Sequence, residues 1–208
     1  MKEEFITPFR YPQIKHTRKY RSVSRPYGQF RALLRREFRR KCVYCRMPDY
    51  LEQQLGFEID HYQPHTRGGD KNEYVNLFYS CRTCNGFKSN FWPTKINWAD
   101  GVFIPNPCDH IMTDHLKFVH KNVQPQSQAG IYTEKLLHLN DIQSIHYRET
   151  MDLMIDVFSS RLSEGRANLK RINKSIHLDP KNHKLVLEKE NLELSLKKIQ
   201  TKLERITF

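Results

Sequence analysis

Two Cys-x-x-Cys pairs constrain the fold of this 208-residue chain more than any other feature of its sequence. Cys42 and Cys45 form the first pair, and Cys81 and Cys84 form the second. Two such pairs, each presented by a tight turn, place four thiolates around one tetrahedral Zn²⁺ ion. We therefore predict a structural zinc site that closes a module too small to bury much core by itself. Neighbouring cations would offset the negative charge of the cluster: Arg40, Lys41, Arg46 and Arg82.

Neither secretion nor membrane insertion is indicated by the sequence. It has no run of about 18 or more apolar residues, and Met1–Glu4 opens the chain without an apolar leader segment. We therefore expect a cytoplasmic protein that does not enter the membrane. Disulfides are uncommon in that compartment, and a thioredoxin-like redox site would need a βαβ pattern that we do not find around either pair.

The fifth cysteine, Cys108, stands apart from both pairs. With His110, His115 and His120 it is a candidate for a second metal cluster. These residues lie in an irregular stretch without a paired knuckle, so we interpret them as ordinary surface and core residues.

A formal net charge of +12 is concentrated in the first fifth of the chain. Residues 1–41 contain thirteen Lys and Arg against three Glu. Arginine predominates there, and its planar guanidinium matches the geometry of phosphate oxygens. The pattern indicates a polyanionic partner such as DNA, and a solvated tail that aids solubility is the simpler alternative. The arginines that we expect to contact DNA lie on one predicted helix: Arg35, Arg36, Arg39 and Arg40.

Proline content and hydrophobic periodicity divide the chain into four parts. We predict a basic N-terminal arm over 1–28, a core over 29–91, an irregular connecting segment over 92–133 and a helical extension over 134–208. Within the core, apolar residues at helical spacing predict a helix over 29–41, and the alternation over 57–60 predicts a strand. We therefore expect an α+β fold.

The last 28 residues carry a heptad pattern that predicts a terminal helix. Leucine and isoleucine recur along one seam, with Lys189 at one core position. Packing against the chain's own helices is the simpler interpretation of three heptads, and a homodimer or a partner coiled coil is the alternative. The apolar seam residues are Leu185, Leu192, Leu196, Ile199, Leu203 and Ile206.

Between the cysteine pairs lie residues that a zinc ribbon alone does not need. Asp60 and His61 end the predicted strand, Asn76 follows, and Asn85 comes directly after the second pair. In this order and spacing, residues 30–91 resemble the HNH, or ββα-metal, endonuclease family. The matching positions are Cys42-x-x-Cys45, Ile59-Asp60-His61, Gly68-Gly69, Asn76-Leu77 and Cys81-x-x-Cys84-Asn85-x-x-Lys88.

The resemblance implies a zinc-bound ββα-metal core that hydrolyses phosphodiester bonds. His61 would be the general base that activates water, and Asn76 would orient it through its side-chain carbonyl. Asp60 and Asn85 would bind a catalytic Mg²⁺ or Mn²⁺ ion through oxygen. Lys88 and Arg67 would contact phosphate. His65 matches no motif position, and Glu58 is expected on the opposite strand face from His61.

Three functions remain open at this point. The favoured one is a metal-dependent DNA endonuclease, and the alternatives are a non-catalytic zinc-ribbon DNA-binding protein and an RNA-cleaving nuclease. Segments within 105–140 loosely resemble small bacterial nucleases of restriction or phage-defence systems, some of which act with an ATPase partner. We therefore expect a role in antiviral defence, with the C-terminal helices binding a partner protein or a second copy of the chain.

Overall fold

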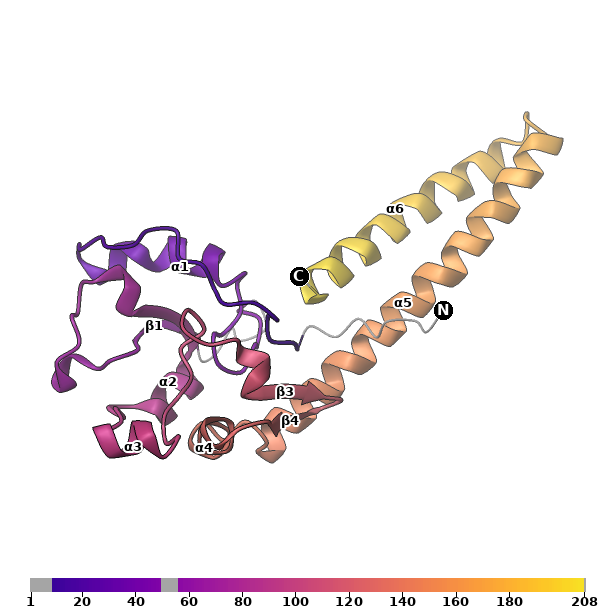
Figure 1. Cartoon of the computed structure of the whole chain (residues 1–208). Coiled ribbons are helices and arrows are strands. Elements are labelled where there is room, and N and C mark those ends of the chain that lie inside the picture. Colours follow the sequence, from indigo (N-terminus) through magenta and orange to yellow (C-terminus); the bar gives the residue numbers. More distant parts are fainter. Residues whose placement is uncertain (1–8, 50–55, 208) are drawn as a thin grey trace. The chain divides into compact units, whose positions relative to one another are not determined.

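The computed structural model describes residues 9–49 and 56–207, which belong to two compact units. The first unit comprises Phe9–His146, and the second begins at Tyr147 (Figure 1). Helices and two small sheets build the first unit, and helices build the second, which confirms the α+β class with a helical C-terminal extension. None of the helices in the described ranges combines the length and the apolar character needed to cross a bilayer.

A two-stranded antiparallel sheet and the helix after it form the centre of the first unit. β1 (Phe57–His61) pairs with β2 (Leu77–Cys81), and Ile59 lies opposite Tyr79. β2 is buried along its whole length, and α2 (Arg82–Lys88) begins directly at its end. The chain between the cysteine pairs therefore has the ββα order that the sequence predicted.

The loop between β1 and β2 contains two short 3-10 helices, η2 (His65–Arg67) and η3 (Tyr74–Asn76). Its turn requires glycine at two successive positions. Gly68 has a φ of 85°, and a Cβ atom on Gly69 would lie 1.9 Å from the carbonyl oxygen of Gln63. The glycine pair thus lets the loop fold back closely on the end of β1.

The predicted first helix consists of η1 (Tyr27–Phe30) and α1 (Arg31–Glu37), and its apolar face is buried. The helix ends at Glu37, whereas the hydrophobic pattern predicted that it continues to Lys41. Arg39 and Arg40 have φ values of 54° and 58°, which are incompatible with a continuing right-handed helix. This reversal directs the chain into the first cysteine pair.

The described part of the predicted basic N-terminal arm packs on the core of the first unit. Arg18 shows this most clearly, because its guanidinium donates to the carbonyl oxygens of Leu77 at 2.6 Å and Val75 at 3.1 Å. It also pairs with Glu37 at 3.4 Å and lies 4.6 Å from the ring centroid of Phe78. One cation of the basic segment therefore stabilises the protein interior.

Residues 92–133 contain regular structure that the sequence analysis missed. β3 and β4 form an antiparallel hairpin, and α4 begins six residues before the predicted boundary at residue 134. Each strand has four residues, so the alternation of apolar side chains is too short to stand out. The elements are α3 (Lys95–Ala99), η4 (Met112–Asp114), β3 (Leu116–Val119), β4 (Asn122–Pro125) and α4 (Gln128–Leu136).

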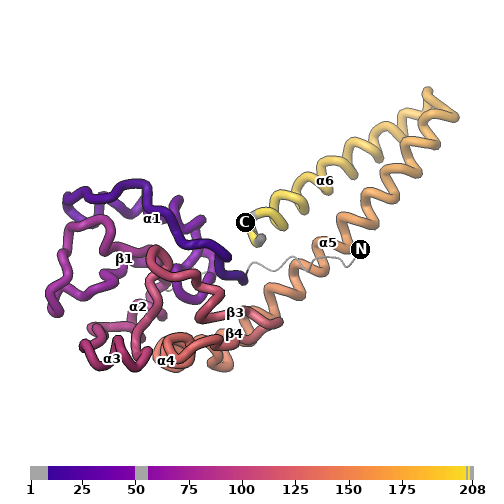
Figure 2. Tube along the Cα trace, in the orientation of Figure 1, coloured from indigo at the N-terminus to yellow at the C-terminus, as the bar shows by residue number. Residues whose placement is uncertain are grey.

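Two long helices, α5 (Ile142–Leu178) and α6 (His183–Thr207), form a hairpin in the second unit (Figure 2). Gly165 of α5 allows a close approach, because a Cβ atom there would lie 2.4 Å from Leu196 Cδ2. The apolar seam residues of α6 are partly or fully buried, whereas Leu187 and Leu194 outside the seam are exposed. The predicted heptad seam thus packs on the chain's own helix, the simpler of the two interpretations.

Replacing Arg18 by Met should lower the free energy of unfolding by about 3–5 kcal/mol, because it leaves the buried Glu37 carboxylate without its guanidinium. Burial raises the pKa of Glu37, but hydrogen bonds from His16 and Tyr74 and the charge of Arg18 lower it below 4.5 overall. Its contribution to stability is therefore present above about pH 4.5 and is lost as pH falls through the lowered pKa.

Chemical denaturation between pH 3 and pH 7 measures both effects, with the exposed Arg21→Met as the matched control. Equal stability of the two variants at pH 7 would contradict the internal role of Arg18.

Candidate functional site

Four cysteine sulfurs converge in the interior of the first unit. Cys42 and Cys45 lie in the turn after α1, while Cys81 ends β2 and Cys84 lies in the first turn of α2. Their Sγ atoms all lie within 4.8 Å of one another, and Cys45 and Cys81 are 3.7 Å apart. A tetrahedron with Zn–S bonds of about 2.3 Å has S–S edges of roughly 3.8 Å. The four sulfurs therefore fit the zinc ion that the sequence predicted.

Hydrogen bonding within the cluster shows why it favours a cation. Burial raises the pKa of Cys42, but hydrogen bonds from the other three cysteines lower it well below its ordinary value. The pKa values of Cys81 and Cys84 are raised, chiefly by their hydrogen bonds to Cys42. Binding of a zinc ion would displace the protons of these thiols, because zinc binds cysteine as the thiolate.

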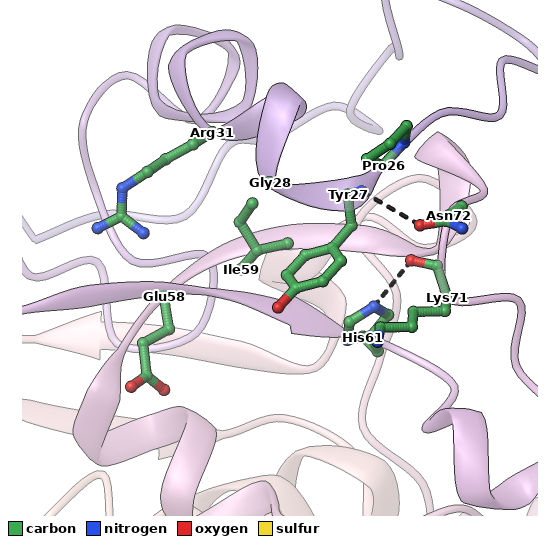
Figure 3. A pocket seen from close by; sticks show the side chains of 9 residues that line it. All are labelled: Pro26, Tyr27, Gly28, Arg31, Glu58, Ile59, His61, Lys71 and Asn72. Atoms are coloured by element: carbon green, nitrogen blue, oxygen red, sulfur yellow. Dashed lines mark hydrogen bonds between the residues drawn. The ribbon is translucent and has the colours of Figure 1, made fainter.

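The imidazole of His61, the predicted general base, lies at the end of β1 and lines an open groove. Its Nε2 lies 2.9 Å from the carbonyl oxygen of Lys71 in the β1–β2 loop (Figure 3). It lines a groove of about 790 Å³ together with Glu58, which the sequence analysis had placed on the opposite strand face. The ring of the exposed His65 has its centroid 6.2 Å from that of His61.

The Asn76 side chain hydrogen-bonds the backbone of the loop around His61 and not the imidazole itself. Its Oδ1 accepts from the backbone N–H of Gln63 at 2.8 Å, and its Nδ2 donates to the carbonyl oxygens of Gln63 and Asp70, both at 2.9 Å. Asp70 precedes Lys71, whose carbonyl oxygen holds the base. The Asn76 side chain therefore contacts the backbone of this loop, and the direct contact with the imidazole that we expected is not formed.

Asp60 is only 3% exposed, and both of its carboxylate oxygens have protein partners. Lys88 Nζ donates to Oδ1 at 2.8 Å, and the Tyr44 hydroxyl donates to Oδ2. Lys88 is itself 1% exposed and also donates to the carbonyl oxygen of His61 at 2.7 Å. Lys88 thus ties α2 to β1, and its burial speaks against the predicted contact with phosphate, which stays a prediction.

Glu58 is a site residue that the sequence analysis did not include. It shares a strand face with Asp60, two residues away, and this i, i+2 relation was the available signal. Its side chain is 41% exposed, and Oε2 accepts from Asn85 Nδ2 at 2.7 Å. That bond uses the amide nitrogen of Asn85 and leaves the amide oxygen for another ligand. Arg82 lies 3.6 Å from the same carboxylate.

These oxygen donors suit a hard divalent cation, which takes few ligands from protein and several from water and phosphate. The carboxylates of Glu58 and Asp60 and the amide of Asn85 are the donors near the end of β1. An ionised carboxylate has about four lone-pair positions, so the two bonds to Asp60 do not exhaust its capacity. Among the described residues, the four cysteines are the only group of three or more His, Cys, Asp or Glu arranged to hold a metal ion.

Two of the arginines that were predicted to contact DNA form ion pairs within the protein. Asp49 accepts from Arg35 at 2.5 Å and from Arg40 at 3.2 Å. Both arginine side chains remain about half exposed, so their charge is offset but accessible. The other predicted contacts, Arg36, Arg39 and Arg67, are exposed.

The histidines of the connecting segment form a small polar cluster. His115 Nε2 lies 3.2 Å from His110 Nδ1, and His115 Nδ1 lies 2.7 Å from the Ser127 hydroxyl. Burial is the main cause that lowers the pKa of both histidines, so both tend to be neutral. Neither Cys108 nor His120 joins them in a metal-ligand group within the described ranges.

The stretch that contains the four cysteines and His61 matches a known protein family. Residues 42–91 match the HNH endonuclease family. The match includes all four zinc-ligand cysteines and the Asp60–His61 pair, and it leaves the N-terminal segment and the C-terminal helices outside. No curated protein and no solved structure matches the chain.

Removal of zinc should unfold the first unit, because the cluster joins α1, β2 and α2 across a small core. Metal analysis should find one zinc ion per chain in the purified protein, and Cys45→Ser should lose it. Tryptophan fluorescence from Trp92 and Trp98 reports the first unit. Cys108→Ser is the control and should retain both zinc and fold; a native spectrum for Cys45→Ser would contradict a structural role.

Lys88→Met tests whether this lysine is structural or binds phosphate. Removing one partner of the buried Lys88–Asp60 pair should lower the free energy of unfolding by about 3–5 kcal/mol. The exposed Lys95→Met is the control and should change stability little. Unchanged stability with a weaker salt dependence of nucleic-acid binding would instead support a phosphate contact.

Proposed function

We propose that this protein is a metal-dependent endonuclease that hydrolyses phosphodiester bonds in DNA. The observation that carries the proposal is the placement of His61. Within the HNH-matched stretch, its imidazole lies on an open groove and is oriented by a backbone carbonyl. Acidic oxygens lie on β1 and an amide oxygen lies on α2. The four cysteines join α2 to the end of β2, the strand that pairs with β1.

The hydrogen bond to Lys71 determines which nitrogen of His61 can act as the base. A carbonyl oxygen only accepts, so Nε2 of the neutral ring must carry the proton. Nδ1 then keeps its lone pair and can take a proton from water. The water so activated attacks the phosphorus atom, and the P–O bond opposite to it breaks.

Asp60 and Asn85 would hold the catalytic cation, as the HNH resemblance implies. A Mg²⁺ or Mn²⁺ ion there would stabilise the charge on the phosphate and on the departing oxygen. Glu58 orients the Asn85 amide through Nδ2, so that the oxygen atom and not the nitrogen atom is offered to the cation. Asn76 keeps the loop that carries the Lys71 carbonyl closed against Gln63.

A second candidate function is supported by the buried Lys88–Asp60 pair. A lysine ammonium on the predicted ligand competes with a divalent cation for the same carboxylate. A zinc-stabilised DNA-binding protein without catalytic activity would be compatible with that contact. RNA is a further substrate candidate, because it presents the same phosphodiester group.

We place the proposed nuclease in bacterial restriction or anti-phage defence, on the loose resemblance of residues 105–140. The four free thiols of a zinc site suit a reducing compartment such as the cytoplasm. Partner binding, to a second copy or to an ATPase, is assigned to the helical hairpin. Exposed apolar residues outside its internal seam support that assignment: Leu153, Met154, Val157, Leu187 and Leu194.

His61→Ala should abolish divalent-metal-dependent cleavage while zinc content and fold are retained. Loss of a general base costs about 10²–10⁴-fold in rate. Cleavage of duplex DNA, single-stranded DNA and RNA is compared with Mg²⁺, with Mn²⁺ and with chelator. His65→Ala is the matched control, because His65 is exposed and has no assigned role.

Binding of DNA without cleavage, under every metal condition, would favour the non-catalytic alternative. Cleavage confined to RNA would identify the third candidate, an RNA-cleaving nuclease.

A further inference from the structure

The groove at His61 has two walls that come from different parts of the chain. β1 and the β1–β2 loop supply one wall, which lies within the HNH-matched stretch. Residues 26–31 supply the other, and they lie outside that stretch. A second hollow of about 560 Å³ shares Gly28 and Arg31 with the first and continues along α1 to Arg35. Because the two hollows share lining residues, we call them together the η1 groove.

Hydrogen bonds fasten the η1 wall to the loop that orients His61. Ser24 and Glu73 form an antiparallel β-bridge, and the backbone N–H of Tyr74 donates to the Val23 carbonyl oxygen at 3.1 Å. The backbone N–H of Tyr27 donates to Asn72 Oδ1 at 3.2 Å. This wall is therefore a built part of the first unit.

Tyr27 lies directly against the predicted base. Its ring centroid is 5.2 Å from that of His61 at an interplanar angle of 62°, and Lys71 Nζ lies 5.5 Å from the ring centroid. Figure 3 shows the ring in front of β1, with its hydroxyl end between Glu58 and His61. That hydroxyl has no hydrogen-bond partner among residues 9–49 and 56–207 in the structure.

Arg31 lies where the two hollows meet. It donates one hydrogen bond to the carbonyl oxygen of Phe57 at 2.5 Å. A guanidinium has five N–H donors in a planar fork, so most of them remain for a ligand. Arg31 and Lys71 are cations, and Glu58 is the one acidic side chain lining the first hollow. Arg82 offsets that acid at 3.6 Å.

We propose that the substrate strand lies in the η1 groove, with Arg31 binding a backbone phosphate and the Tyr27 hydroxyl donating to the phosphate beside His61. This proposal deepens the proposed nuclease function and rests on it. The recognised chemistry is the phosphodiester backbone, because a guanidinium fork matches two phosphate oxygens and a phenol hydroxyl donates to one. The Tyr27 ring also limits rotation of the His61 imidazole, so Tyr27 is both a substrate contact and a positioning residue.

The binding arm of the experiment uses the full chain in a His61→Ala background, so that cleavage does not interfere. Fluorescence anisotropy with a labelled DNA duplex is measured over a range of salt concentrations. Arg31→Gln should raise Kd about 5–10-fold and reduce the salt slope by about one, as expected for one lost phosphate contact. Arg31→Lys keeps the charge and loses the planar fork, so its Kd should lie between those of the His61→Ala parent and of Arg31→Gln.

Arg21→Gln is the matched control, since Arg21 is exposed, lines neither hollow and is not among the predicted DNA contacts. Thermal unfolding of every variant separates weak binding from misfolding. An effect of Arg21→Gln as large as that of Arg31→Gln would overturn the groove assignment, because general surface charge would then explain both.

The cleavage arm separates the hydroxyl of Tyr27 from its ring. Tyr27→Phe should lower kcat by about 10-fold with the pH profile unchanged, because only a phosphate donor is lost. Tyr27→Leu should lower kcat further and alter the pH profile, because the imidazole also loses its ring contact. Wild-type rates and pH profiles in both variants would overturn the role of Tyr27.

The two arms distinguish this proposal from the nuclease function. If the wild-type chain cleaves and neither the Tyr27 nor the Arg31 variants differ from it, the groove proposal fails and the nuclease stands. If the wild-type chain never cleaves but Arg31→Gln still weakens binding selectively, the nuclease fails and the groove assignment of the strand stands.

Discussion

Four sulfur atoms hold together the parts of the chain that build the candidate active site. They join the turn after α1, the end of β2 and the first turn of α2 within 4.8 Å. A two-stranded sheet buries too little apolar surface to fix these elements by packing alone. A zinc ion bound by these sulfurs would therefore set the position of α2 against β1, and with it the positions of Asn85 and Lys88. The cluster is buried, which suits a structural task, and in the proposed nuclease the chemistry on a phosphate would fall to the oxygen donors of β1 and α2.

The second constraint is the loop between β1 and β2. Asn76 spans it with three hydrogen bonds, and Gly69 permits its backbone to approach Gln63. The closed loop presents the Lys71 carbonyl to His61, and this fixes the tautomer of the imidazole. The N-terminal segment pairs with the same loop, so the orientation of His61 depends on residues before the HNH-matched stretch as well as within it. The site is thus shared between the matched module and the chain around it.

Charge in this protein serves the interior as well as the surface. The net charge of +12 suggested a surface for a polyanion, yet several of the cations engage protein groups. Arg18 holds carbonyl oxygens and Glu37, Arg35 shares Asp49 with Arg40, and Lys88 is enclosed with Asp60. Counting cations in a sequence therefore overestimates the surface available to DNA. Arg31, between the two hollows of the η1 groove, uses one of its donors internally and keeps the others for a ligand.

The cysteine spacing by itself determined the four-sulfur cluster, because each knuckle is a local turn that presents two sulfurs whatever the rest of the chain does. Hydrophobic periodicity likewise determined the first helix, β1 and the terminal helix, since it acts within one element. It failed for β3 and β4, whose four residues are too few to show a period. Only the tertiary structure decided that Lys88 turns inward to Asp60, 28 residues away, and that Tyr27 lies against His61. Those contacts depend on how separate elements are packed together, and no local pattern in the sequence encodes that distance.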